Sequence, residues 1–134
     1  MVDLTGEGLA EGVRRITARK GVDIVIESIG GAVTSEALSS LGLGGVLITL
    51  GYSAGRKTVI DVTDLIWKRA RMAGFSLFAQ SAATIAAAWR VILPLIVSGS
   101  VNPIVERVYP FGEAGEALRH LIEDRPFGKV VLAA

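Results

Sequence analysis

Small residues follow two Val/Ile-rich segments, and these are the first places where this chain could bind a ligand. The segment VDIVIE at 22–27 runs into SIGG at 28–31, and GGVLIT at 44–49 runs into LGYSAG at 50–55. Glycine and serine leave the backbone open to close approach by another molecule. In doubly wound parallel sheets, ligands bind just beyond the carboxyl ends of the strands. The two turns therefore predict a binding site at that edge of a sheet.

Few other side chains could perform acid–base or metal chemistry. Glu27 ends the first strand, and we expect it to accept hydrogen bonds from the following turn amides rather than to act as a general acid. His120 is expected at the surface or at the boundary of the core. The basic clusters Arg56–Lys57 and 68–71 are typical of solvated faces. No acid–base pair, catalytic triad or set of metal ligands is visible in the sequence.

The composition indicates a globular protein and excludes several classes of function. The 134 residues are 51% hydrophobic and 20% charged, which is too apolar for a disordered chain. A net charge of +1 gives no field that would draw the chain to nucleic acid or to a membrane. The absence of cysteine and the single histidine exclude thiolate zinc sites and cysteine nucleophiles, and fit a reducing compartment. Neither a secretion signal nor an uninterrupted membrane span is visible, so we expect a cytoplasmic protein.

The hydrophobic pattern predicts alternating helices and strands. Strands are expected at 22–27, 46–50, 72–78, 104–109 and 129–133, and helices at 4–20, 32–43, 65–71, 81–98 and 112–124. Asp61 or Thr63 is expected to cap the third helix, and Ser81 the fourth. This order favours an α/β fold whose first three strands form an open parallel sheet. The last two strands can belong to a different layer or domain.

Four motifs together resemble the C-terminal part of the medium-chain dehydrogenase/reductase superfamily. They are VDIVIESIGG at 22–31, GGVLITLG at 44–51, KRARMAG at 68–74 and GKVVL at 128–132. Each motif is weak by itself, but their order and spacing cover essentially the whole chain. The branch that they resemble most is the zinc-independent quinone oxidoreductase and enoyl reductase group.

The resemblance implies the distal half of a Rossmann-type doubly wound parallel sheet, with a C-terminal segment that returns to a missing catalytic domain. Residues 1–98 would be the partial nucleotide-binding domain, and residues 99–134 the segment of the catalytic domain. The family's glycine-rich pyrophosphate loop is absent, because LGLGG at 41–45 lies at a helix end and before a strand. The chain would therefore be a fragment of an NADPH-dependent oxidoreductase without zinc, which transfers hydride to a quinone or an activated double bond. By itself it would bind NADPH weakly or not at all and show no turnover.

The resemblance also implies a cofactor site but no catalytic or metal residue in this chain. The first turn would pass the ribose and pyrophosphate, the second turn would lie beside the nicotinamide, and main-chain groups of the third strand would hold the carboxamide. Each position also has a structural explanation: an ordinary turn, packing of an aromatic side chain, or a solvated arginine beyond a helix end. The implied cofactor-binding residues are Ser28, Ile29, Gly30, Leu50, Gly51, Tyr52, Ser53, Phe75, Ser76, Leu77 and Arg125.

A half-sheet has two edge strands, and both are expected to pair with other chains. The strand at 23–27 becomes an edge if the preceding strands are missing, and the strand at 72–78 is the opposite edge, through which members of the family dimerise. We therefore expect a homodimer, and the partners of the whole enzyme would be a small quinone or enone, with no nucleic acid and no membrane. The main alternative is a non-catalytic dimerisation module with the same fold. A flavodoxin-like or receiver-like domain is disfavoured, because only Glu27 of the expected acidic cluster is present.

Overall fold

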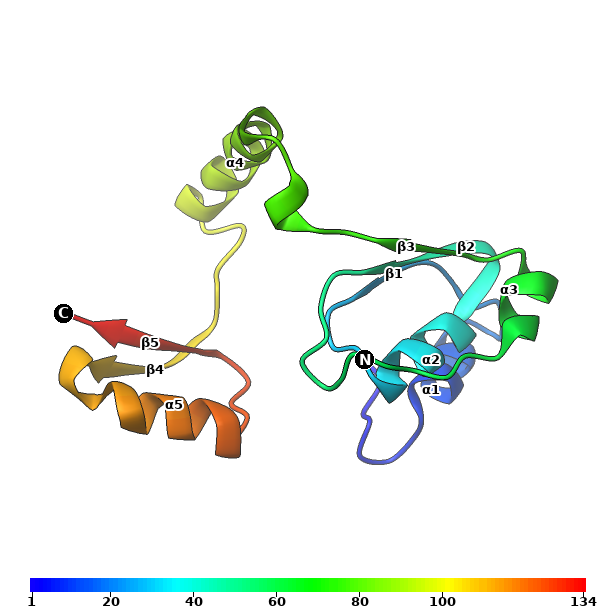
Figure 1. The fold of residues 1–134 in the computed structure, drawn as a ribbon, viewed down its shortest axis with the longest axis horizontal. Coiled ribbons are helices and arrows are strands. Elements are labelled where there is room, and N and C mark those ends of the chain that lie inside the picture. The colour runs from blue at the N-terminus through cyan, green and yellow to red at the C-terminus, as the bar shows by residue number, and fades with distance from the viewer. The chain divides into compact units, whose positions relative to one another are not determined.

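The computed structural model describes residues 1–134 and contains two compact units, Met1–Ala79 and Gln80–Ala134 (Figure 1). The first unit contains α1 (Leu9–Ile16), β1 (Val22–Glu27), α2 (Ala32–Ser39), β2 (Leu41–Thr49), α3 (Val62–Lys68), β3 (Arg71–Gly74) and the 3₁₀ turn η1 (Leu77–Ala79). The second contains α4 (Ala82–Val97), β4 (Val105–Pro110), the 3₁₀ turn η2 (Phe111–Glu113), α5 (Ala114–Glu123) and β5 (Lys129–Ala133). The predicted α/β class is confirmed. The assignment of residues 1–98 and 99–134 to two domains of a whole enzyme stays a prediction.

The first unit is built on a three-stranded parallel sheet in the order β1-β2-β3. Its register places Val25 beside Leu47 and Leu47 beside Met72, so that Glu27, Thr49 and Gly74 end the three strands at one level. The Val/Ile-rich sequences of β1 and β2 suit this pleated, closely packed arrangement. Within this sheet β1 and β3 are the two edges, as the sequence predicted.

One face of this sheet carries the core, and the other face is open. Leu47 on β2 is fully buried and packs in one cluster with Ala37 and Leu38 of α2 and with Leu41. Figure 1 shows α1 and α2 on the same side of the sheet. Ile24 and Ile26 alternate with the inward residues of β1 and remain 63% and 71% exposed. The chain therefore buries only one face of this strand.

The boundaries of β2 and β3 differ from the predictions for physical reasons. Strand β2 begins at Leu41, because Gly42 allows close backbone packing: a Cβ there would lie 2.5 Å from the carbonyl oxygen of Lys20. LGLGG is therefore part of a strand rather than the end of a helix. Strand β3 ends at Gly74, opposite the end of β2, so Phe75, Ser76 and Leu77 lie beyond the strand rather than within it.

Helices α1 and α2 are shorter than predicted. Helix α1 ends at Ile16, and Ala18 and Arg19 then take left-handed φ values of 49° and 67°, which break the helical path. Helix α2 ends at Ser39, because the next residues already belong to β2. The turns that follow both helices bring the chain directly into the sheet.

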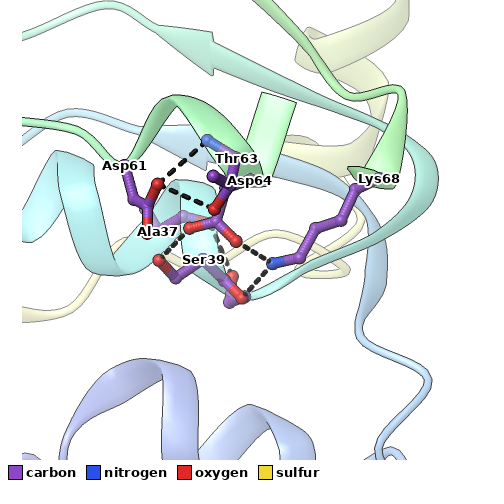
Figure 2. Close-up of polar contacts among 7 residues, drawn as sticks. Ala37, Ser39, Asp61, Thr63, Asp64 and Lys68 are labelled. Atoms are coloured by element: carbon purple, nitrogen blue, oxygen red, sulfur yellow. Dashed lines mark hydrogen bonds and ion pairs between the residues drawn. The ribbon is translucent and has the colours of Figure 1, made fainter. Parts of the chain in front are cut away.

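Helix α3 is held against the end of α2 by a polar cluster, which Figure 2 shows. Asp61 caps the helix, since its Oδ1 accepts hydrogen bonds from the Thr63 amide at 2.9 Å and the Thr63 hydroxyl at 2.7 Å. Lys68 Nζ lies 2.8 Å from Asp64 Oδ1 and donates to the Ser39 carbonyl at 2.7 Å, while the Ser39 hydroxyl donates to Asp64 Oδ2. Burial alone would raise the pKa of Asp64, but the bonds from Lys68 and Ser39 lower it.

The second unit has a small parallel pair, β4 and β5, connected through α5. Its buried residues are Tyr109 on β4 and Ala117 on α5. His120 lies at the boundary of this core, with Nδ1 2.7 Å from Asp124 Oδ2 and its ring 6.1 Å from that of Tyr109. Helix α4 begins at the predicted cap, because Ser81 Oγ accepts from the Thr84 amide at 3.1 Å. None of the helices combines the length and apolarity needed to cross a bilayer.

Candidate functional site

The two glycine turns are joined to each other at the carboxyl ends of β1 and β2. The Gly31 amide donates to the Gly55 carbonyl at 3.0 Å, and the Ala54 amide donates to the Ile29 carbonyl at 2.7 Å. Gly30 has a φ of 76°, and a Cβ there would collide with the carbonyl oxygen of Gly55. Glycine at this position is therefore required both by the backbone conformation and by the contact between the turns.

A buried carboxylate holds the first turn in place. Glu27 is 4% exposed, and its Oε1 accepts hydrogen bonds from the amides of Ile29 and Gly30, the latter at 2.6 Å. Its Oε2 accepts from the hydroxyls of Thr34 at 3.1 Å and Thr49 at 3.2 Å. Four donors thus converge on one side chain and connect β1, the turn, α2 and β2. The prediction that Glu27 bonds the turn amides is confirmed.

The hydrogen bonds outweigh burial in setting the charge of Glu27. Burial by itself would raise the pKa of this carboxyl, but the donors lower it below its ordinary range, with the Gly30 and Ile29 amides contributing most. Glu27 is therefore ionised at neutral pH. A carboxylate that has a lowered pKa and accepts four hydrogen bonds is suited to positioning the turn, not to donating a proton.

Two pockets open beside these turns. The first has a volume of about 630 Å³ and the second about 590 Å³, and both include Thr49, Gly51 and Tyr52. The first pocket extends toward α2 and the loop after the second turn, with Gly30, Gly31, Thr34, Gly55, Arg56, Lys57, Thr58 and Met72. The second extends toward the end of β3, with Leu50, Gly74, Phe75, Ser76, Leu77 and Phe78.

The structure brings most of the predicted cofactor-binding residues to these pockets. Gly30 lines the first pocket, Gly51 and Tyr52 line both, and Leu50, Phe75, Ser76 and Leu77 line the second. Ser28, Ile29 and Ser53 line neither, although the Ser53 hydroxyl donates to the Ile29 carbonyl at 3.5 Å. Arg125 belongs to the second unit, where it follows α5 with a left-handed φ of 48°.

Sequence reasoning missed four side chains that surround the first pocket. Thr34 and Thr49 support Glu27, and the position of Thr49 at the end of β2 could have indicated a partner for a carboxylate at the end of β1. Arg56 and Lys57 were expected on a solvated face; both are exposed, but they also line the pocket. The Arg56 guanidinium lies 5.3 Å from the centre of the Tyr52 ring, within the range of a cation–π contact.

Comparison with known proteins gives the family. The family model described as "Zinc-binding dehydrogenase" matches residues 1–132, and the chain therefore belongs to that family, as the C-terminal portion of a medium-chain dehydrogenase/reductase. It is 32% identical to the synaptic vesicle membrane protein VAT-1 of Tetronarce californica, over 96% of this chain and 38% of that protein. It is 25% identical to quinone oxidoreductase-like protein 2 of Bos taurus, over 98% of this chain and 39% of that protein.

A solved structure supports the same assignment. The crystal structure of 2-haloacrylate reductase superposes with a TM-score of 0.79 at 25% identity, over 98% of this chain and 42% of that one. The chain thus spans less than half of the length of the relatives that it matches. The residues present do not suit a zinc ion, despite the family's description, because the chain has no cysteine and no cluster of three His, Asp or Glu side chains.

Proposed function

We propose that this chain is the nicotinamide-binding part of an NADPH-dependent, zinc-independent oxidoreductase that reduces a quinone or an activated double bond. The observation that carries the proposal is the pair of hydrogen-bonded glycine turns at the carboxyl ends of β1 and β2, with a pocket on either side of the second turn. This is the edge at which open parallel sheets bind nucleotides. The names of two relatives, a quinone oxidoreductase-like protein and a 2-haloacrylate reductase, support the substrate class.

The roles follow the positions of the three segments. Ser28, Ile29 and Gly30 would lie along the ribose and pyrophosphate, where small groups and a rigid backbone permit close approach. Leu50, Gly51, Tyr52 and Ser53 would lie beside the nicotinamide. Phe75, Ser76 and Leu77 follow the end of β3, and their main-chain groups would hold the carboxamide of the nicotinamide. Arg125 remains a proposed contact from the second unit.

The chemistry of the proposed reaction belongs to the cofactor, which supplies hydride when it is bound. The residues of this chain would bind and orient the nicotinamide; none of them is assigned a proton-transfer step. Glu27 keeps the first turn in shape through its four hydrogen bonds. The remaining part of such an enzyme, in the cytoplasm in our proposal, would provide the substrate contacts, and the isolated chain should show no turnover.

A titration with cofactor fragments tests the proposal. We expect nicotinamide mononucleotide, at millimolar concentration, to shift the amide resonances of the ¹⁵N-labelled chain at the three segments. Adenosine, which has no phosphate, should leave them unchanged, because none of these segments is assigned to the adenosine. NADPH and NADH should act alike on this chain. Shifts that are absent, or that follow adenosine instead, would contradict the proposed site.

The open face and edges of the first sheet favour a second candidate, a dimerisation module without catalytic function. Ile24 and Ile26 are exposed on β1, and both β1 and β3 have unpaired edges within their sheet.

Under either function we propose a homodimer formed through edge strands. A clean monomer in light scattering at all concentrations would contradict the dimer. Strong self-association without any nicotinamide-dependent shift would favour the module over the enzyme, as would an encoded mass that matches the 14.1 kDa of this chain.

A further inference from the structure

Two adjacent cations line the first pocket without a charged partner. Arg56 and Lys57 are both exposed, and neither takes part in the ion pairs of the chain. The Arg56 guanidinium approaches the ring of Tyr52, which carries no charge that would neutralise it. Lys57 also lines a neighbouring pocket beside Ser35 and Glu36, and the Glu36 carboxylate is already bonded to the Leu9 amide at 2.6 Å. Both cations are therefore free to meet an anion that enters the pocket.

The charges around the pocket give it a positive sign. Its lining contains Arg56 and Lys57 but no acidic residue. The nearest buried carboxylate, Glu27, lies behind Thr34 and Thr49, and its oxygens are occupied by four donors. Two cations and one carboxylate leave a formal charge of +1 at the pocket. The first turn of α2, which begins at Ala32, adds the positive end of its dipole on the same side.

Part of the pocket lining is bare backbone. Gly30, Gly31 and Gly55 line the same pocket as Arg56 and Lys57 and present no side chains to it. An anionic group attached to a ligand that lies on the glycine turns can therefore come within reach of a guanidinium and an ammonium group together. Guanidinium binds phosphate and carboxylate through paired N–H donors, and ammonium adds a mobile point charge.

We propose that Arg56 and Lys57 form an anion subsite that binds the phosphate or carboxylate group of the ligand held on the two glycine turns. This inference rests on the proposed function for the identity of that ligand. The anionic group has two chemical sources, a phosphate of the nicotinamide nucleotide or the carboxylate of an acidic activated alkene. The subsite would make this chain selective for one of them over its uncharged analogue.

A charge-matched control exists at the opposite end of the same sheet. Arg69 and Arg71 line another pocket with Leu43 and Gly44, at the amino ends of the strands and away from the glycine turns. The double substitutions Arg56→Gln/Lys57→Gln and Arg69→Gln/Arg71→Gln each remove two positive charges from the first unit. A general effect of net charge would appear equally in both variants, whereas a subsite would be lost only in the first.

The first experiment titrates inorganic pyrophosphate into the ¹⁵N-labelled chain and its two variants, and follows the amide resonances by NMR. We expect shifts centred on residues 55–58, an affinity about fivefold or more lower in the Arg56→Gln/Lys57→Gln variant, and a change below about twofold in the control. The affinity should fall as salt is added, because the charges are exposed. Equal losses in both variants, or shifts centred on Arg69 and Arg71, would overturn the subsite.

Two pairs of probes then distinguish the sources. Loss of nicotinamide mononucleotide binding in Arg56→Gln/Lys57→Gln, with nicotinamide riboside binding unchanged, would identify the cofactor's phosphate. Loss of acrylate binding, with acrylamide binding unchanged, would identify an acidic substrate. If the double substitution affects the charged and the uncharged probe equally in both pairs, the proposed subsite is overturned, even where pyrophosphate binds.

The outcomes also separate this inference from the proposed function. Shifts from nicotinamide mononucleotide at the three segments, without any effect of Arg56→Gln/Lys57→Gln, would leave the oxidoreductase proposal standing and overturn the subsite. Binding of acrylate and pyrophosphate at residues 55–58 without any nicotinamide-dependent shift would support the anion site and contradict the proposed function.

Discussion

The two units of this chain bury their apolar residues very differently. In the first unit, Ala37, Leu38, Leu41 and Leu47 form a contiguous buried cluster beside a sheet. In the second unit the buried residues are Tyr109 and Ala117, and α4 has none. Trp89 and Val97, both on α4, are 54% and 80% exposed. The first unit thus has a core of its own, whereas the second leaves most of its apolar surface open.

The same difference appears in the carboxylates of the two units. Glu27 is buried and accepts four hydrogen bonds from four different residues. Glu106 in the second unit has a side chain that is 39% exposed, and its Oε2 accepts a hydrogen bond from the Gly128 amide at 3.2 Å. The candidate site therefore lies in the unit that has a contiguous buried core and a fully hydrogen-bonded buried carboxylate.

The largest effect is expected from Glu27→Ala. The substitution leaves buried donors from Gly30, Thr34 and Thr49 without an acceptor, and should lower the free energy of unfolding of the first unit by about 3 to 5 kcal/mol. Hydrogen exchange of the β1 and β2 amides, measured by NMR, would report it. Glu106→Ala is the matched control in the second unit and should cost less than about 1 kcal/mol. Similar losses in both variants would remove the contrast between the units.

Gly30→Ala should come second, and it separates contact from backbone strain. Gly30 and Gly44 have nearly equal left-handed φ values of 76° and 77°, but a Cβ collides with the Gly55 carbonyl oxygen only at Gly30, while Gly44 has open space. Gly44→Ala should cost about 1 kcal/mol from the backbone alone. Gly30→Ala should cost about 2 to 3 kcal/mol and separate the two turns, because the collision adds to that strain. Thermal unfolding of the two variants measures the difference, and equal costs would show that the turns are not closely joined.

The sequence predicted best where local chemistry decides the structure. Strand β1 lies between Gly21 and the SIGG turn, and β5 is a short Val-rich run; both have their predicted bounds. The cap at Ser81 and the cap at Asp61 were also expected, since each side chain bonds an amide two or three residues ahead. In each case the signal and its cause are within a few residues of one another.

The sequence-based predictions were wrong where backbone contacts between residues far apart in the chain determine the ends of a strand. The early start of β2 depends on Gly42 packing beside Lys20, which no local pattern reveals. The end of β3 depends on the end of its neighbour, so Phe75 was placed in a strand that stops one residue earlier. The glycine turns of the site were predicted, but the position of Arg56 and Lys57 beside the pocket was not. These two residues lie in an irregular loop, whose path no hydrophobic periodicity indicates.

Acid should weaken the first unit through Glu27. The lowered pKa of Glu27 in the folded protein means that its contribution to stability is present in full above the ordinary glutamate pKa of about 4.3, and is lost as the pH falls through the lower folded value. Denaturant unfolding at a series of pH values should therefore show a loss of stability below about pH 4. In Glu27→Gln this part of the slope should disappear, although the variant is less stable at neutral pH. An unchanged slope would mean that other carboxyls control acid unfolding.

Lys68→Met should have the smallest effect, and it tests what the KRARMAG motif does. Lys68 connects α3 to α2 through Asp64 and the Ser39 carbonyl (Figure 2), with 25% of its side chain exposed, so the loss should be about 1 kcal/mol. A double-mutant cycle with Asp64→Asn should give a coupling of about 0.5 to 1 kcal/mol in thermal unfolding. Lys129→Met on β5 is the control and should stay within about 0.5 kcal/mol of the parent. If Lys68→Met instead left stability unchanged and weakened nicotinamide mononucleotide binding, the lysine would act on the ligand, and the polar cluster of Figure 2 would not be what holds the helices together.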